Sequence, residues 1–306
     1  MSGVGQLNQS EANAQISQPT DLEALEQERV ALKKFIRSSR LKSVGISLVA
    51  GIAGTFLMGD PFLGFATAVV AYFLAMEFMT KSKRLAFKAN FKKQVVGIIV
   101  KSFGLNFKQD DGVHMDNFLM IYDCKVNRYL CEDLIYGQVD GVNIELSDVQ
   151  AYEVKRITDE KSTQTMRFRG ILFVADFNKK LAATTQVCFR SSYDLVKYGE
   201  RAQMDNVEFE KYFDVYSTDQ IGARYVLTPS MMEKIHALFL KLDRAINIVF
   251  DGSKIYIAIE TFKDNFEANI NKSLKDNATI ELYKKEIENL IDIVRELNLN
   301  EKIWVS

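Results

Sequence analysis

One long apolar stretch constrains this chain more than any other feature. Residues 44–79 contain one aspartate and one glutamate and no basic residue. A straight helix of this length would be about 54 Å long, whereas the hydrocarbon core of a bilayer is about 30 Å thick. Gly59-Asp60-Pro61 interrupts the stretch near its middle, and a proline can start a helix but not continue one. The sequence therefore predicts two short transmembrane spans, roughly 42–58 and 62–79, folded as a hairpin. The alternative is a buried helical hairpin of a soluble protein.

Basic residues without any acid flank this stretch on both sides. We name residues 29–42 and 81–93 the basic collars, because each range holds six basic residues and no acidic one. The turn between the spans carries Asp60 as its single charge. The positive-inside rule therefore predicts a multi-pass membrane protein with both termini in the cytoplasm. The lipid bilayer is then a partner, and the collars are expected to bind its anionic headgroups. The cations expected to do so are Arg29, Lys33, Lys34, Arg37, Arg40, Lys42, Lys81, Lys83, Arg84 and Lys88, and Lys92 and Lys93 complete the second collar.

Small residues recur at four-residue spacing within both spans. Such rows let helices approach closely in lipid, so they serve packing within the hairpin, oligomerisation, or both. The rows are Ser47/Gly51/Thr55, Ala50/Gly54, Gly64/Ala68 and Ala71/Ala75.

The net charge of −1 conceals an uneven distribution. Without the twelve collar residues, 27 basic residues remain against 40 acidic ones, so the rest of the chain is strongly acidic. An acidic bulk argues against nucleic-acid binding, which needs a broad basic face. The three cysteines, Cys124, Cys131 and Cys188, have no CxxC spacing, which together with the predicted topology indicates reduced thiols.

The segments around the spans are predicted to be helical. Residues 1–19 are polar and expected to be disordered. A capping-box pattern at Thr20–Glu23 predicts a helix that runs into the first span. Apolar residues at helical spacing continue the second span to Gly104. The two extensions pack as an antiparallel stalk, which we favour, or residues 84–103 lie on the membrane surface.

From about residue 105 the pattern is that of an α+β domain with antiparallel sheet. Two hairpins are predicted around Asp140-Gly141 and Asp251-Gly252. A helix capped by Thr228 separates the two β regions, and a last helix covers about 279–298. The predicted strands are Leu134–Val139, Val142–Leu146, Val149–Ile157, Met166–Asp176, Thr184–Arg190, Ala245–Phe250 and Lys254–Glu260, with a polar loop at Thr158–Thr165. The predicted domains are thus a tail (1–19), a helical membrane region (20–104) and a cytoplasmic α+β domain (105–306).

Several motifs in this domain are distinctive. They lie between Asn117 and Asp148 (117–137 and 144–148), at Phe168–Lys179 (FRGILFVADFNK) and at Glu208–Pro229 (EFEKYFDVYSTDQIGARYVLTP). Together they resemble an uncharacterised bacterial family, domain of unknown function thirty-one thirty-seven. The likeness extends from about residue 20 over most of the chain. It implies the domain limits, the two-span start and a bacterial inner membrane location, and it implies no activity, cofactor or catalytic residue.

The sequence offers no strong catalytic motif. The two histidines, His114 and His236, are far apart and belong to no metal-ligand spacing, so we predict no metal site. Cys188 has the pattern of a small core residue, and a basic segment beside Cys124 and Cys131 leaves a lowered thiol pKa open. Phosphate-binding loops and a GxSxG elbow are absent from the sequence, and no cofactor is predicted.

Carboxylates provide the weak candidates for catalysis. Asp176, in the segment Asp-Phe-Asn-Lys, follows a strand, where a turn is favoured over a cation site. The stretch Asp205–Arg224 holds five acids and one arginine, which could form a cleft with paired carboxylates. The favoured alternative is structural: its aromatic residues pack, Asp219 caps a short helix and Arg224 forms an ion pair. The weak catalytic candidates are Asp176, Asp214, Asp219 and Arg224.

The sequence as a whole favours a non-enzymatic function. We expect a membrane-anchored cytoplasmic module that binds a protein partner or self-associates. The alternatives are a membrane-tethered hydrolase that uses the carboxylates near Asp176 and Asp205–Asp219, and a pore of oligomerised hairpins, although the spans offer little polar lining.

Overall fold

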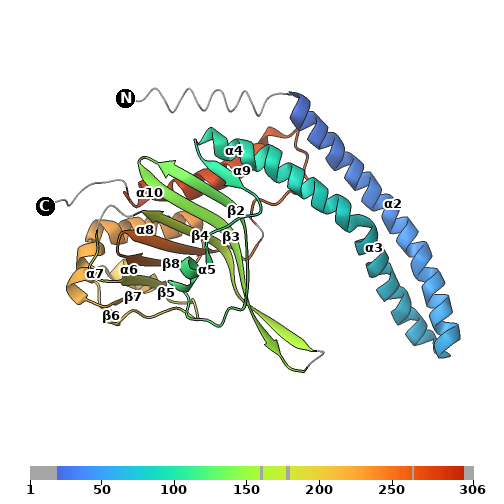
Figure 1. Ribbon diagram of the computed structural model, residues 1–306, viewed down its shortest axis with the longest axis horizontal. Helices are drawn as coiled ribbons and strands as arrows, with labels where there is room; N and C mark the ends of the chain where they lie inside the picture. Colours follow the sequence, from blue (N-terminus) through green and yellow to red (C-terminus); the bar gives the residue numbers. More distant parts are fainter. Residues whose placement is uncertain (1–18, 159–160, 177–179, 264, 300–306) are drawn as a thin grey trace. The chain divides into compact units, whose positions relative to one another are not determined.

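The computed structural model describes residues 19–158, 161–176, 180–263 and 265–299. These residues form two compact units, a helical unit (19–98 and 267–282) and a sheet unit (99–266 and 283–299). The helical unit holds two long apolar helices packed as a hairpin, and the sheet unit holds an antiparallel sheet with helices (Figure 1). The predicted α+β fold class is therefore confirmed. The predicted disordered tail lies outside the described residues, apart from Pro19, which begins the first helix.

The hairpin consists of α2 (Pro19–Met58) and α3 (Pro61–Phe91), which run side by side (Figure 1). Its turn is where the sequence predicts it. Gly59 has a φ of +67°, a conformation that glycine adopts without strain. Asp60 then caps α3, because its side chain accepts a hydrogen bond from the main-chain amide of Phe62 at 2.7 Å. Pro61 follows as the first helical residue, where its missing N–H costs nothing.

Small residues bring α2 and α3 into close contact. A Cβ added to Gly64 would lie 2.8 Å from the carbonyl oxygen of Gly51 and would also collide with the hydroxyl of Thr55. A Cβ added to Gly51 would lie 2.9 Å from that of Ala68. Real Cβ atoms do not approach other atoms this closely, so only glycine fits at these crossing points. Gly51 and Gly64, from two of the predicted small-residue rows, thus pack within the hairpin.

Both helices continue beyond the predicted spans and pack against each other. The ammonium group of Lys83 lies 3.7 Å from the ring centroid of Phe35. At Lys92–Val96 the second helix becomes a π-helical turn, η1, and it then resumes as α4 (Gly97–Ser102). This side-by-side packing is the one expected of a stalk. The apolar contacts of the extensions include Leu25, Leu32, Phe87 and Phe91, none more than 4% exposed.

The sheet unit is built on nine described strands in the order β1-β2-β3-β4-β9-β8-β5-β7-β6, with all described pairings antiparallel. The strands are β1 (Asn106–Lys108), β2 (Arg128–Val139), β3 (Val142–Arg156), β4 (Ser162–Asp176), β5 (Thr185–Phe189), β6 (Glu200–Ala202), β7 (Phe213–Ser217), β8 (Ile246–Asp251) and β9 (Lys254–Glu260).

Both predicted hairpins are confirmed, β2–β3 around Asp140-Gly141 and β8–β9 around Asp251-Gly252. Several details of the strand prediction are wrong. β2 begins at Arg128 instead of Leu134, and β7 has no counterpart among the predicted strands. The strands expected at Val142–Leu146 and Val149–Ile157 are one strand, β3, because it stays paired with β2 on one side and β4 on the other. The expected loop at Thr158–Thr165 is shorter, since β4 already begins at Ser162 and pairs with the end of β3. Residues 159–160 of that loop lie outside the described residues.

Helices cover the sheet, and α8 (Pro229–Leu242) begins as predicted. The hydroxyl of Thr228 caps it by accepting a hydrogen bond from the amide of Met231 at 3.2 Å. The predicted last helix is wrong in one respect: it is α9 (Asn277–Ile291) and α10 (Ile293–Glu296), divided at Asp292. The residues next to this division, Ile291, Ile293 and Val294, are all buried. In one straight helix they would point to different sides, and a helix that buries a single face would leave some of them exposed. The shorter helices are α5 (Met115–Leu119), α6 (Val207–Tyr212) and α7 (Gln220–Val226).

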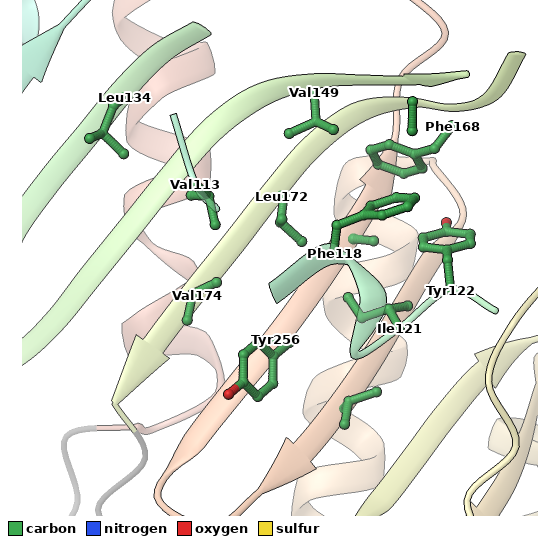
Figure 2. Packing of buried hydrophobic residues seen from close by; sticks show 13 residues of the cluster. Val113, Phe118, Ile121, Tyr122, Leu134, Val149, Phe168, Leu172, Val174 and Tyr256 are labelled. Atoms are coloured by element: carbon green, nitrogen blue, oxygen red, sulfur yellow. The ribbon is translucent and has the colours of Figure 1, made fainter. Parts of the chain in front are cut away.

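An aromatic cluster fills one face of the sheet (Figure 2). The ring of Phe118, from α5, stacks on that of Tyr122 with centroids 4.8 Å apart. Phe168 of β4 packs against both rings at 5.5 and 5.2 Å. Next to this cluster, the hydroxyl of the buried Tyr122 donates to Glu260 at 3.1 Å and accepts from the amide of Asn247. The short helix α5 thus closes a core that the strands alone would leave open.

We predict that Gly64→Ala separates the two helices of the hairpin. The added methyl group collides with the main chain of Gly51, and such overpacking costs about 1–3 kcal/mol. The measurement is disulfide formation between Ser43→Cys and Met79→Cys, whose native side chains lie 3.9 Å apart. Gly45→Ala is the matched control, because a Cβ there has nothing within 4 Å. Equal cross-linking in both variants would contradict the close packing.

Candidate functional site

The acidic stretch 205–224 does not converge on one cleft. Glu208 forms an ion pair with Lys211 at 2.6 Å, on the surface of α6. Glu210 accepts a hydrogen bond from the main-chain amide of Met204 at 2.8 Å. The aromatic residues Phe209 and Phe213 between these acids are fully buried. This division into packed aromatic and separately bonded acidic side chains is the structural alternative that the sequence favours.

Asp214 lies on β7 between two cations. Its carboxylate is 2.8 Å from the guanidinium group of Arg201, on β6, and 3.1 Å from that of Arg190, just after β5. The three side chains form an ion-pair group across the strands at one end of the sheet.

Asp219 caps α7, as predicted. Its two carboxylate oxygens accept hydrogen bonds from the main-chain amides of Ile221 and Gly222, at 3.3 and 2.8 Å. The ion pair expected for Arg224 is not formed among the described residues. Its guanidinium group instead donates to the carbonyl oxygens of Gln220 and Gln203, at 3.1 and 3.2 Å.

Asp176, at the end of β4, accepts a hydrogen bond from Asn143 at 2.6 Å. Residues 177–179, the rest of the predicted turn or cation site, lie outside the described residues. In the sheet, β4 and β7 are separated by β9, β8 and β5. Four strand spacings of about 4.8 Å place Asp176 on the order of 19 Å from Asp214. The two carboxylates therefore do not share one site, and catalytic roles for Asp176, Asp214, Asp219 and Arg224 stay predictions.

The cysteines and histidines do not form a reactive or metal-binding group in the described part of the chain. All three cysteines are free. Burial raises the pKa of the Cys124 thiol to about 11 and that of Cys188 to about 12, and burial also raises the pKa of Cys131. The lowered thiol pKa left open for Cys124 and Cys131 is thus contradicted. Among the described residues, no three His, Cys, Asp or Glu side chains gather as a metal site would require.

We predict that Asp219→Ala lowers stability by about 1 kcal/mol, because α7 loses its N-cap. The measurement is the thermal unfolding midpoint of the full chain in detergent. Asp219→Ser, which restores a capping oxygen, is the matched control and should recover most of the loss. A midpoint unchanged by the alanine substitution would show that the cap is not the role of this residue.

The helical unit contains a more distinctive group of residues. Three cations of the basic collars form ion pairs with acidic residues of the chain. Arg29 is 7% exposed and forms a two-bond ion pair with Glu26, with both N–O distances 2.8 Å. Lys88 and Lys92 lie 2.6 and 3.0 Å from the carboxylate of Glu267. These three cations hold parts of the protein together, so they differ from the exposed members of the collars.

The ion pairs fix a segment that we name the strap, residues 267–274, to the two helices. Arg29 also donates to the carbonyl oxygen of Ile270 at 2.6 Å. The carboxylate of Glu26 accepts two further hydrogen bonds, from the hydroxyl of Ser273 and the amide of Leu274, both at 3.0 Å. Both carboxylate oxygens of Glu26 thus accept hydrogen bonds from α2 and from the strap, although the strap is distant in sequence. Sequence reasoning missed this pairing, since nothing local marks Glu26 as the partner of residues 270–274.

A cavity of about 500 Å³ opens between α2, α3 and the strap. Five cations line it, and no acidic residue does. Four come from one face of α2, where residues three, four and seven positions apart share a side. No side-chain hydrogen bond or ion pair joins any of the five to another described residue, and the Nε of Arg84 is buried without a partner. The lining residues are Val30, Lys33, Lys34, Ile36, Arg37 and Arg40 of α2, Arg84 of α3, and Ile270 and Asn271 of the strap.

The structure thus sorts the collars into two groups. Arg29, Lys88 and Lys92 build the fold, whereas Lys33, Lys34, Arg37, Arg40 and Arg84 face a common space. Unpaired cations around one cavity repel each other, and a bound anion would remove this repulsion. The guanidinium groups can hold phosphate or carboxylate oxygens with two parallel hydrogen bonds each. This basic cavity is the candidate functional site.

The ion pair behind the cavity has a defined pH response. The hydrogen bonds from Arg29, chiefly, lower the pKa of Glu26 from 4.5 to about 2. A carboxyl group whose pKa falls on folding stabilises the protein above its unfolded pKa and loses that contribution as the pH falls towards its folded value. The stabilisation by Glu26 is therefore complete above about pH 5 and is lost between about pH 4.5 and pH 2.

We predict that Glu26→Gln destabilises the full chain by on the order of 3 kcal/mol at pH 7, because it leaves Arg29 buried without its counter-charge. The measurement is the unfolding midpoint of both proteins in detergent from pH 7 to pH 2.5. The difference should shrink steadily below about pH 4.5. Glu28→Gln, which changes a carboxylate that accepts from Asn90 at 3.1 Å, is the control. A pH-independent difference for Glu26→Gln would contradict the assignment.

A comparison with protein families finds a match to part of the chain. Residues 166–299 match the model of a family described as protein of unknown function DUF3137. This confirms the predicted resemblance for the motifs that begin at Phe168 and Glu208. The motif at Asn117–Asp148 and the two-span start lie outside the matched range. No curated protein matches the chain in sequence.

One solved structure is similar, the crystal structure of the mycobacterial trehalose monomycolate transport factor A, TtfA. Its sequence identity to this chain is 12%, and its TM-score is 0.37. The alignment covers 68% of this chain and 93% of that one.

Proposed function

We propose that this chain, which carries a DUF3137 domain over residues 166–299, is a membrane-anchored binding and assembly module. The helices α2 and α3 cross the membrane as a hairpin, and the two basic collars and the sheet unit lie on the cytoplasmic side. The sheet unit then binds a protein partner or a second copy of the chain at that membrane face.

The exposure of the hairpin is the observation that carries this proposal. Both helices contain an apolar window long enough to cross a bilayer, and only 17% of one window and 6% of the other is buried. Exposed large apolar side chains follow one another along positions 44–78, and Phe56, Leu57 and Phe78 are 85%, 86% and 90% exposed. Burying such a side chain is worth about 1.5–3 kcal/mol, so leaving the whole surface in water would be very unfavourable. The core helix of a soluble protein would bury most of these side chains instead.

The charge distribution supports the orientation. Both collars lie within a few residues of the ends of the predicted spans, which is where basic residues direct topology. The turn carries Asp60, which the structure places at the tip of the hairpin as the cap of α3. Exposed apolar residues of the sheet unit, such as Tyr193, Val207 and Ile221, are of the kind that protein partners cover.

Reporter fusions test the anchoring and the orientation together. A reporter inserted at residue 60 should be active only outside the cytoplasm, and one fused to the C terminus only inside. Alkaline extraction of membranes should leave the chain in the pellet. A chain released by alkali would contradict the anchor, and a C terminus that reports outside would contradict the orientation.

A further inference from the structure

We propose that the basic cavity binds the phosphate-bearing headgroup of an anionic phospholipid. This inference rests on the proposed membrane anchoring and makes it more specific. The generic expectation is that every collar cation attracts anionic lipid equally, whereas the cavity singles out one set of cations as a binding site. The occupant is a lipid with phosphate and a net negative charge, held at the headgroup by residues of α2, α3 and the strap.

The charge balance of the cavity favours an anion. Lys33, Lys34, Arg37, Arg40 and Arg84 contribute five positive charges to its lining. Two acids of the same unit, Glu26 and Glu267, are already bonded to Arg29, Lys88 and Lys92. An ordinary basic surface would be interspersed with acids, and here the strap contributes Ile270 and Asn271 to the lining instead. The phosphate group is the common biological anion that matches several guanidinium groups at once.

The position of the cavity along the helices favours a lipid as the source of that phosphate. Arg40 is two residues before the first predicted span, so about 3 Å separates it from the hydrocarbon along the helix axis. Arg84 is five residues beyond the second span, which corresponds to about 8 Å. The headgroup layer on each side of a bilayer is about 5–8 Å thick, so both guanidinium groups lie at its depth. Lys33 lies about 14 Å from the span and reaches charge that projects further into water.

The remaining lining suits an amphiphile better than a free ion. Val30, Ile36 and Ile270 give the cavity an apolar component beside its cations. A volume of about 500 Å³ is in the range of cavities that hold whole small molecules, and it is much larger than a single phosphate ion needs. The strap closes one side, and it is fixed there by the hydrogen bonds of Arg29 and Glu26. The site is therefore built by the fold and is more than a charged stretch of helix.

The experiment is a lipid titration of the full chain in non-ionic detergent, followed by native mass spectrometry. The lipids are diphosphatidylglycerol, phosphatidylglycerol and phosphatidylcholine. The cavity variant is Lys34→Gln/Arg37→Gln/Arg40→Gln, three exposed side chains whose replacement leaves the packing of α2 intact. The control variant, Lys42→Gln/Lys81→Gln/Lys93→Gln, removes the same charge from exposed collar residues that do not line the cavity.

We expect wild-type protein to bind the two anionic lipids more tightly than phosphatidylcholine. The cavity variant should lose about tenfold more affinity for them than the control, which corresponds to about 1.4 kcal/mol. Equal losses in the two variants would overturn the proposal, because they would show a diffuse effect of the collars. Competition by inorganic pyrophosphate at concentrations similar to those of the lipid would overturn the lipid as the source of the phosphate. Since the titration is done in detergent, its outcome is independent of the topology that the reporter fusions measure.

Discussion

The buried carboxylate of Glu26 is the interaction on which the helical unit depends. It accepts hydrogen bonds from Arg29, one turn away, and from Ser273 and Leu274, which are almost 250 residues further along the chain. A buried ion pair contributes little if its remaining donors and acceptors are unsatisfied, and here each oxygen has two partners. The pair therefore fixes the strap to α2, and the basic cavity exists because the strap is held there.

The two units of this protein distribute their large apolar side chains in opposite ways. In the sheet unit the large apolar side chains are buried, with Phe118, Tyr122 and Phe168 packed over β4. In the hairpin the large apolar side chains point outward, and the small residues Gly51 and Gly64 face the partner helix. This inversion is what a lipid environment requires, because lipid solvates the large side chains and close contact between helices provides the attraction. The exposed apolar surface and the inner glycines are thus two results of one constraint.

Sequence patterns predicted the elements whose signals are local. The two hairpins with Asp-Gly turns, the caps at Thr228 and Asp219, and the long apolar helices were all predicted, because each depends on residues that adjoin in sequence. The short elements β1, β6, β7, α5 and α6 were missed, since three to six residues carry no period that can be measured. The break before α10 was also missed, because burial on several sides of the chain decides it. For the candidate site, the sequence identified the cations but could not tell which are paired.

The sequence alone determined that residues 44–79 form two apolar segments joined at Gly59-Asp60-Pro61, and that basic residues flank them. It also determined the α+β pattern of the rest, since composition, period and turn chemistry are local properties, and its motifs carried the DUF3137 resemblance. Only the tertiary structure decided that Arg29, Lys88 and Lys92 bind Glu26 and Glu267, whereas Arg37, Arg40 and Arg84 share a cavity. The physical reason is that pairing depends on distance in space, and residues 267–274 reach α2 and α3 only when the chain has folded.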